Sequence, residues 1–535
     1  MKRRKLSASL LSIAVALGIF APFRSAYGAK TFVYCSEGSP NTFNPELATD
    51  STSLNATNAV FDKLVRFQPG TTTIIPGLAE SWQISKDGLS YTFKLRKNVK
   101  FHTTANFIPS RNFNADDLVF SINRQRLKEH PYHDVGKATY ESFDSMGLGK
   151  LIKDVVKVDD YTVRFILSEP SSPFLADLTM EFACVLSAEY GDQLMKKKTP
   201  EKIDIEPVGT GAFTFVRYDK DQMIRYKANA DYWDGKPKID NLVFSITTDA
   251  SVRYQRLKAG ECHLIAEPSP SDIDSMKKEA NIKLMELAGL NVAYLAFNVE
   301  KKPFDNILVR QAINYALNRK SYIDAIYLGH AKLAKNPLPP GIWSYDQKIS
   351  DYDYNPEKAK ELLKKAGFPD GLSMEIWTLP VSRVYNPNGK KMGEMMQADL
   401  QKVGIKVKLV TYDWPTYIQK TRDGEHQTMM MGWIADNGDP DNFLDDLLSC
   451  DAVGAGANRA RWCYQPYNEL VRKAQRISNK AERTKLYEQA QVIFKEQAPW
   501  VTLAHAIFYR AMSKRVTGYS MDLFCRDYFN KVDLN

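Results

Sequence analysis

A run of helix and strand signals between residues 355 and 411 constrains the fold most strongly. Residues 355–367 carry a complete helix pattern, with an N-capping Asn, a Pro in the first turn and a closing Gly. Strands are predicted over 372–379 and 405–411, with a helix between them. Two strands joined through a helix are neighbours in a parallel sheet with a right-handed crossover. The run therefore predicts an α/β fold.

The rest of the chain indicates more than one globular unit. Residues 31–208 mix alternating strand patterns with turns, and 114–126 have the pattern of a capped helix. Residues 224–246 fit two strands joined by a Gly/Pro loop, and residues 309–326 are helical in period throughout. The length of 535 residues also exceeds the size at which a single core stops growing.

Two apolar, strand-like segments, 289–298 and 501–510, are candidates for crossings between lobes. Both also fit core strands, and a strand at a hinge is often a core strand as well. The sequence leaves both interpretations open.

The N-terminus has the composition of an export signal. Residues 2–5 are all cationic, residues 6–23 are mostly apolar, and small residues before Ala29 fit a cleavage site. An uncleaved membrane anchor is the alternative, but the apolar run is near the lower length limit for a spanning helix. We expect residues 1–28 to be removed. Because Cys35 is the first cysteine and lies in a strand-like segment, we expect no lipid anchor on the exported protein.

The charge that remains argues against nucleic acid as a partner. The formal net charge is +9, and five cations lie in residues 1–28, which leaves +4 for the exported chain. Lys and Arg are spread along the chain rather than clustered, whereas a nucleic-acid binder concentrates them on one face.

The cysteine pattern favours disulfides over metal binding. None of the six cysteines forms a CxxC pair, and an even count in an oxidising compartment favours disulfide bonds. Cys450 and Cys463 enclose a short loop, which is a natural local crosslink. Spacing alone does not pair the other four.

Two charged residues lie just beyond predicted strands. Arg383 follows the strand at 372–379, and Asp436 follows a second strand at 427–432. In open α/β sheets, ligands bind beyond the carboxyl ends of strands. A guanidinium can bind a peptide carboxylate in a bidentate way, and a carboxylate can pair with a peptide ammonium. The alternative is that both residues form ordinary surface or interdomain ion pairs.

Catalysis and metal binding find no support in the motifs. The chain contains no G-x-S-x-G, H-E-x-x-H or Walker A sequence. The acidic segment 436–443 fails the EF-hand spacing. We therefore expect neither an enzyme nor a metal site.

Several longer segments together carry a family resemblance. They are residues 30–45, 77–102, 113–121, 209–215, 385–388 and 423–443, of which the last two are the most specific. On these segments the chain resembles the peptide- and nickel-binding solute receptors of bacterial ABC importers, and within them the members that bind dipeptides. The resemblance covers essentially all of the chain after residue 28. In 209–215, Ala212 replaces the family's Pro.

The resemblance implies a periplasmic-binding-protein fold of type II, cluster C, in which two lobes close over the ligand by a hinge. An extra domain is inserted in the first lobe. The expected division is lobe I at 29–61, 213–288 and 508–535, the extra domain at 62–212, and lobe II at 289–507.

The resemblance also implies roles for individual residues. Arg383 would hold the peptide carboxylate and Asp436 the peptide ammonium. The pocket would be lined by Asp50, Ser51, Thr52, Tyr385, Gly432 and Trp433. Disulfides are expected between Cys35 and Cys262 and between Cys450 and Cys463, while Cys184 and Cys525 fall outside this pattern and are either free or paired.

The function implied is capture of a dipeptide in the periplasm and its delivery to an inner-membrane ABC permease, by a monomer without a cofactor. Residues 46–57 differ from the dipeptide-binding members, so side-chain preference and even ligand class stay open. Haem is the alternative ligand, with His426 and the methionines at 429–431 near the relevant loop, although a Met run in a strand is more typical of core packing. A secreted hydrolase is a remote alternative.

Overall fold

The computed structural model describes residues 28–137, 140–455 and 457–535. All of the predicted export signal except Gly28 lies outside these residues. Within them, no helix combines the length and the apolar composition needed to cross a membrane.

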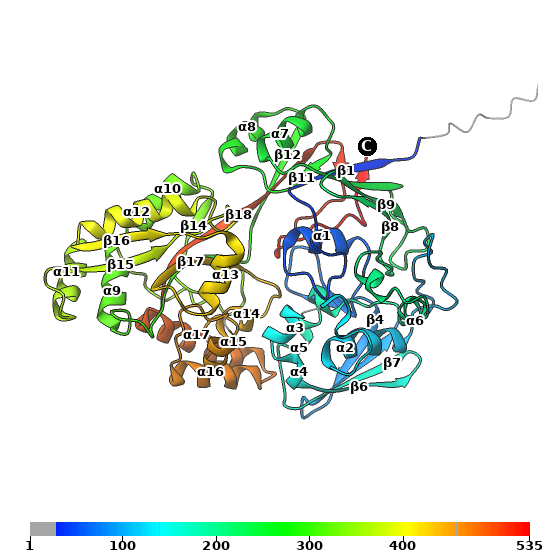
Figure 1. The fold of residues 1–535 in the computed structure, drawn as a ribbon, viewed down its shortest axis with the longest axis horizontal. Helices are drawn as coiled ribbons and strands as arrows, with labels where there is room; N and C mark the ends of the chain where they lie inside the picture. Colours follow the sequence, from blue (N-terminus) through cyan, green and yellow to red (C-terminus); the bar gives the residue numbers. More distant parts are fainter. Residues whose placement is uncertain (1–27, 138–139, 456) are drawn as a thin grey trace, which may run out of the picture.

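A 12-stranded sheet forms the centre of the molecule (Figure 1). One half runs in the order β16 (Ile405–Val410), β15 (Leu372–Trp377), β17 (Thr428–Ile434), β13 (Asn291–Phe297). The other half runs β11 (Leu264–Ile265), β1 (Thr31–Ser36), β10 (Asn241–Ile246), β9 (Met223–Ala228), β8 (Phe213–Asp219). The long strand β18 (Trp500–Ser513) lies between the halves.

Strand β18 belongs to both halves of the sheet. Its first part pairs with β13 and β14 (Ala331–Leu333), and its second part pairs with β11 and β12 (Ile282–Ala288). The two segments predicted as crossings, 289–298 and 501–510, thus fall on β13 and β18, and both are buried strands. The interpretation as core strands is confirmed, and the pairing of β18 makes it also a connection between the halves.

The β-α-β unit predicted over residues 355–411 is confirmed. Helix α11 (Pro356–Lys365) begins at Asn355, whose side chain accepts a hydrogen bond from the Lys358 amide. Strands β15 and β16 are parallel and are joined through α12 (Gly389–Gln401).

The continuous helical period over residues 309–326 is interrupted in the structure. Helix α9 (Ile307–Ala316) ends at Leu317, whose backbone is extended, and α10 (Arg319–Ile326) follows. The Asn318 amide donates to Asp399 Oδ2 at 2.9 Å instead of to a helix carbonyl. A tertiary hydrogen bond therefore overrides the local periodicity at this point.

A second, four-stranded sheet lies beside β8–β10. Its order is β4 (Ala79–Ile84), β5 (Ser90–Leu95), β7 (Thr162–Leu167), β6 (Ile152–Asp159). With it lie β2 (Val65–Phe67), β3 (Ile74–Pro76), α2 (Ala115–Arg126), α3 (Glu141–Ser145), α4 (Leu148–Leu151), α5 (Phe174–Asp177) and α6 (Ala188–Lys196). Helix α2 begins at the predicted cap Asn114 with a full capping box.

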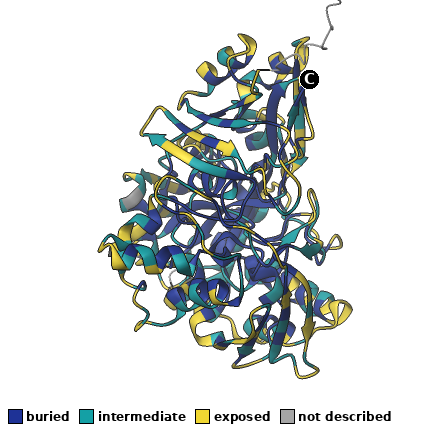
Figure 2. Ribbon diagram, turned by 90° about the vertical axis from the view of Figure 1, so that its right-hand side faces the viewer, coloured by how far each residue is buried: buried dark blue, intermediate teal, exposed yellow. Residues whose placement is uncertain are grey.

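The remaining elements cover the sheets and close the chain. They are α1 (Ser51–Asn58), α7 (Ala250–Lys258), α8 (Ile273–Lys278), α13 (Trp414–Arg422), α14 (Asp441–Leu444), α15 (Cys450–Ala455), α16 (Gln465–Gln475), α17 (Lys480–Gln497), β19 (Val516–Thr517) and β20 (Asp533–Leu534). Buried residues follow the central strands, while exposed residues edge the outer helices and loops (Figure 2).

The molecule has two large hydrophobic cores, which define two lobes. One core unites the β1–β8 half of the sheet with the four-stranded sheet, and the other surrounds β13, β15 and β17. Val384 and Ile434 pack against both cores, so they mark the boundary between the lobes. The residue limits given above for lobe I, the extra domain and lobe II stay predictions.

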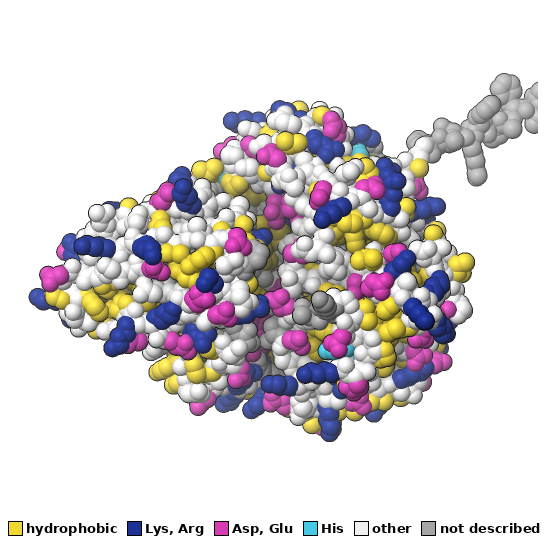
Figure 3. All heavy atoms as spheres, viewed as in Figure 1, with side chains coloured by type: hydrophobic (Ala, Val, Ile, Leu, Met, Phe, Trp, Pro, Cys, Tyr) yellow, Lys and Arg dark blue, Asp and Glu magenta, His cyan; other side chains and the backbone are white. Residues whose placement is uncertain are grey.

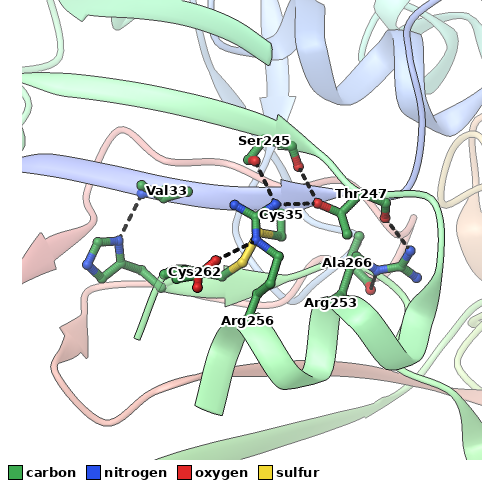
Figure 4. The surroundings of a disulfide bond; sticks show 10 residues. Val33, Cys35, Ser245, Thr247, Arg253, Arg256, Cys262 and Ala266 are labelled. Carbon is green, nitrogen blue, oxygen red and sulfur yellow. Dashed lines mark hydrogen bonds and ion pairs between the residues drawn. A yellow bond between two sulfur atoms is a disulfide. The ribbon is translucent and has the colours of Figure 1, made fainter. Parts of the chain in front are cut away.

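Both expected disulfides are present. Cys35 and Cys262 join β1 to the turn before β11 (Figure 4), and Cys450 and Cys463 close a short loop. Cys184 and Cys525 are free and buried, which decides the alternative that the sequence left open.

Candidate functional site

Arg383 and Asp436 follow neighbouring parallel strands. Strands β15 and β17 pair in parallel register, with Ile376 opposite Thr428. Their carboxyl ends therefore meet at one edge of the sheet, which is where open α/β sheets bind ligands. The loop with Arg383 and the turn with Asp436 both begin at this edge, beside the lobe boundary.

The Arg383 side chain is held in place without being neutralised. Its backbone exchanges two hydrogen bonds with Asn386, of 3.0 and 2.9 Å, which fix the loop. Its guanidinium lies over the Trp414 ring, 4.4 Å from the centroid, a cation–π contact that orients the planar fork. It forms no ion pair within 4.0 Å with any carboxylate of the described chain, so it can accept an anionic ligand.

Tyr385 and Gly432 connect the two loops. A Cβ added to Gly432 would lie 2.2 Å from a carbon of the Tyr385 ring, so only glycine allows this approach. The Tyr385 carbonyl accepts a hydrogen bond of 2.6 Å from the Tyr327 hydroxyl. The Arg383 loop is thereby packed onto the end of β17.

Trp433 and Asp436 share one hydrogen-bond acceptor. The Trp433 indole donates to Asn442 Oδ1 at 3.1 Å, and the Asp436 amide donates to the same oxygen at 2.9 Å. Asn442 therefore fixes the position of the turn that carries Asp436 relative to the end of β17.

The Asp436 carboxylate is in a protected position that still reaches solvent. Its side chain is 30% exposed, and its nearest cation is Arg526, with 3.7 Å between Oδ1 and Nη2. Burial raises the pKa of Asp436 to about 6; the Arg526 charge lowers it and the Glu181 charge raises it. Arg526 pairs with this carboxylate only at long range, so the carboxylate can still bind a second cation.

Arg526 was not singled out from the sequence. It lies in the C-terminal segment and is also 3.5 Å from Glu181. Arg526 and Asp436 are far apart in the sequence, so no short motif contains both. They become neighbours only in the folded chain.

Asp50, Ser51 and Thr52 lie at the start of α1 on the first lobe. Asp50 is the N-cap and accepts a hydrogen bond of 2.9 Å from the Ser53 amide. Thr52 donates to Glu37 Oε1 at 2.6 Å, and Ser51 is half-buried. In the described part of the chain, none of the three has a hydrogen bond to Arg383 or Asp436. They stay predicted site residues.

Figure 3 shows a groove between the two halves of the molecule, with acidic side chains along it. No water-sized cavity is left among Phe508, Arg510, Tyr519, Met521, Asp522, Cys525 and Arg526, the residues around the partner of Asp436. A cavity of about 690 Å³ lies elsewhere, between residues 100–112 and the β8–β9 hairpin, and includes none of the predicted site residues.

The residues considered for haem are part of the core. Met429 and Met430 are fully buried in β17, and the His426 ring nitrogen Nε2 bonds to the Arg459 carbonyl at 2.8 Å. Within the described residues, no three His, Cys, Asp or Glu side chains are grouped so as to hold a metal ion.

Comparison with known proteins identifies the family. Residues 73–455 match the family described as bacterial extracellular solute-binding proteins, family 5. A dipeptide-binding protein from Escherichia coli (strain K12) is 50% identical over 99% of this chain and 98% of its own length. Haem-binding protein A from Haemophilus influenzae is 50% identical over 94% of this chain and 92% of its own length.

A solved structure is similar over the whole fold. The dipeptide-binding protein from Pseudoalteromonas sp. SM9913, in complex with Met-Leu, matches with a TM-score of 0.86 and 39% identity, covering 95% of this chain and 100% of that one. The chain belongs to family 5 of the bacterial extracellular solute-binding proteins, and it has their two-lobe α/β fold. These three relatives are binding proteins rather than enzymes.

Proposed function

We propose that the protein captures dipeptides in the periplasm by pairing both peptide termini with opposite charges. Arg383 binds the carboxylate and Asp436 binds the ammonium. The observation that carries this proposal is the placement of an unpaired guanidinium and an incompletely paired carboxylate beyond two neighbouring parallel strands. Relatives that are named for dipeptide binding support the same ligand class.

Two fixed charges at a set separation select ligand length. A peptide of the wrong length leaves one charge buried without a partner, which costs several kcal/mol. Tyr385, Gly432 and Trp433 form the wall between the charges, and Asp50, Ser51 and Thr52 contribute from the facing lobe. Closure of the lobes about β18 then encloses the peptide.

The closed protein delivers the peptide to an ABC permease in the inner membrane. The protein acts as a monomer, without a cofactor, metal ion or chemical step on the ligand. Residues 1–28 direct export and are removed. Haem remains the alternative ligand because a relative that is 50% identical is named for it.

The test is isothermal titration of the ligand-stripped protein with Ala-Leu, Ala-Leu-Ala, alanine, leucine and haemin. We expect Ala-Leu to bind at least tenfold more tightly than the tripeptide, and the amino acids not to bind. Binding of haemin alone, or of no compound, would overturn the proposal.

A pair of variants assigns the ammonium site. Asp436→Asn removes the charge and keeps the shape, so we expect dipeptide affinity to fall on the order of 100-fold, as for loss of a hydrogen-bonded charge pair. Asp423→Asn removes an exposed carboxylate just before β17 and serves as the matched control. Equal affinities for the two variants would exclude Asp436 from the site.

A further inference from the structure

Asp436 stands at the end of a row of four alternating charges. Lys63 Nζ lies 3.5 Å from Glu181 Oε1, and Arg526 Nε lies 3.5 Å from the same oxygen. Arg526 Nη2 lies 3.7 Å from Asp436 Oδ1. The sign therefore changes at every step of the row. The ammonium of a bound peptide would be a fifth charge, of the sign that the row requires next.

The first two charges are placed by the backbone of the lobe that contains β1. Lys63 forms an isolated antiparallel bridge with Cys184, and Glu181 begins the short 3-10 turn that leads into this bridge. Cys184 is part of the same hydrophobic core as the residues of β1. The Lys63 and Glu181 side chains are only 12% and 9% exposed. The pair is therefore an internal contact of this lobe rather than a surface ion pair.

Arg526 is fixed to β1 through the acids on either side of it. The Arg526 amide donates to Asp522 Oδ1 at 3.3 Å, and the carboxylate of Asp527 accepts a hydrogen bond of 2.8 Å from the Tyr34 hydroxyl in β1. Asp436 instead follows β17, in the other half of the sheet. The contact between Arg526 and Asp436 thus joins the two halves of the molecule.

Arg526 divides its charge between two carboxylates, Glu181 and Asp436. Burial raises the pKa of Glu181, but the charges of Lys63 and Arg526 outweigh burial, so this pKa lies below its usual value. Glu181 is therefore ionised. Its negative charge offsets the repulsion between Arg526 and a peptide ammonium that binds to Asp436.

The charge of Asp436 depends on Arg526. Burial disfavours the ionised carboxylate most strongly, and Arg526 is the largest influence that favours it. A neutral Asp436 would leave the peptide ammonium buried without a partner. The other titratable side chains on the elements packed around Asp436 are Asp177, Asp446, Asp522 and Tyr528. These four carry no positive charge, so the positive charge beside Asp436 comes from Arg526.

We propose that Arg526 is a positioning residue of the ammonium site, which keeps the Asp436 carboxylate charged for the peptide. This inference rests on the proposed function, because Arg526 acts through the residue assigned to the peptide ammonium. Glu181 acts in the opposite sense, since its negative charge disfavours a second one on Asp436. Removal of either neighbour should therefore change the pH dependence of dipeptide binding, and the two changes should have opposite signs.

The test measures Ala-Leu affinity by isothermal titration of the ligand-stripped protein at pH 5 and pH 8. Arg526→Gln removes the cation beside Asp436 and leaves Glu181 its partner Lys63. Without this cation, the pKa of Asp436 should rise above its value of about 6. We expect the variant to bind about tenfold or more weakly than the unchanged protein at pH 5, and within about twofold of it at pH 8. The peptide α-amino group titrates alike with both proteins, so it does not affect this ratio.

Three more variants separate charge from structure. Arg526→Lys keeps the positive charge and should bind within about threefold of the unchanged protein at both pH values. Glu181→Gln removes the opposing charge, so its affinity should rise about threefold or more at pH 5 and change at most about twofold at pH 8. This variant keeps the test decisive if Arg526→Gln does not fold. Arg515→Gln removes an exposed cation from the C-terminal segment as a control and should leave both affinities unchanged.

The possible failures are distinguishable. An equal loss of affinity at pH 5 and pH 8 in Arg526→Gln would mean that Arg526 is merely structural and overturns the inference. Tighter binding by this variant at pH 8 also overturns it, because Arg526 would then compete with the ammonium. An affinity of Glu181→Gln at pH 5 that is unchanged or lower has the same consequence. Absence of dipeptide binding by the unchanged protein overturns the proposed function together with the inference.

Discussion

At the scale of single residues, the raised pKa of Asp436 has a direct consequence for ligand binding. A carboxylate that pairs with an ammonium must be ionised, and the pKa of Asp436 in the ligand-free protein is about 6. The ligand ammonium and carboxylate do not change charge between pH 5 and 7. Protonation of Asp436 therefore competes with the ligand as the pH falls.

We expect dipeptide affinity to be about tenfold lower at pH 5 than at pH 7, because one proton must leave Asp436 on binding. Titrations at pH 5, 6 and 7 measure this slope. The same titrations on Asp436→Asn should show little pH dependence. A slope that persists unchanged in the variant would assign the proton to another group, such as Asp522, whose pKa is also raised to about 6 by burial.

The role proposed for Arg383 depends on the shape of its side chain as well as on its charge. Arg383→Lys keeps the positive charge but loses the planar fork and its stacking on Trp414. We expect dipeptide affinity to fall about tenfold or more, while the unfolding temperature of the ligand-free protein stays the same. Arg217→Lys, on the exposed face of β8, is the control. Full affinity in Arg383→Lys would mean that a point charge is sufficient there.

At the scale of elements, the two disulfides should differ in their effect on stability. Cys35 and Cys262 are 227 residues apart, whereas Cys450 and Cys463 are 13 apart. The chain-entropy account gives about 5 and about 3 kcal/mol for loops of these lengths. We expect the paired change Cys35→Ala and Cys262→Ala to lower the urea midpoint more than the paired change at 450 and 463. The reverse order would show that the long crosslink acts chiefly on the native state.

Element boundaries were predictable where local chemistry sets them. Asn114 and Asn355 cap their helices through hydrogen bonds to amides two or three residues away, so the sequence contains both partners. The break between α9 and α10 was not predictable, because the Asn318 amide bonds to Asp399, far along the chain. Contacts of this kind are set by tertiary packing alone.

The residues of the candidate site also differ in whether the sequence could predict them. Arg383 and Asp436 could be predicted as site residues because each follows a strand that its own pattern predicts, and because the family resemblance implies a ligand role for both. Arg526 could not, since its contact with Asp436 arises from packing between distant segments. The residues proposed to hold the ligand charges were thus easier to predict from the sequence than the charged residues around them.

At the scale of the whole molecule, contacts across the groove should favour the form in which the two lobes are closed. The Ser172 amide and hydroxyl donate to the carbonyls of Gln475 and Ile477, at 2.7 and 2.6 Å. Glu169 pairs with Arg476 at 2.6 Å. These bonds join the part of the chain around α5 to the region of α16 in the other lobe, at the end of the groove remote from β18 (Figure 1).

Rotation of the lobes about β18 would break these contacts first, because they lie farthest from the axis. Bonds present only in the closed form raise its population and therefore the apparent affinity for the ligand. Ser172→Ala combined with Arg476→Gln removes one hydroxyl hydrogen bond and one exposed ion pair, which together contribute about 1–2 kcal/mol at most. We expect dipeptide affinity to fall about three- to tenfold, and the ligand-free protein to show a larger radius of gyration in X-ray scattering.

The control for this change is Lys358→Gln, which removes an exposed ion pair with Glu361 inside one lobe. It should alter neither affinity nor radius. If the double variant binds as tightly as the unchanged protein and scatters identically, the contacts do not affect closure. Closure would then depend on the ligand charges and the β18 crossing alone. A larger radius in the ligand-free variant that returns to the original value on dipeptide binding would identify the Ser172 and Arg476 contacts as a latch that the ligand reinforces.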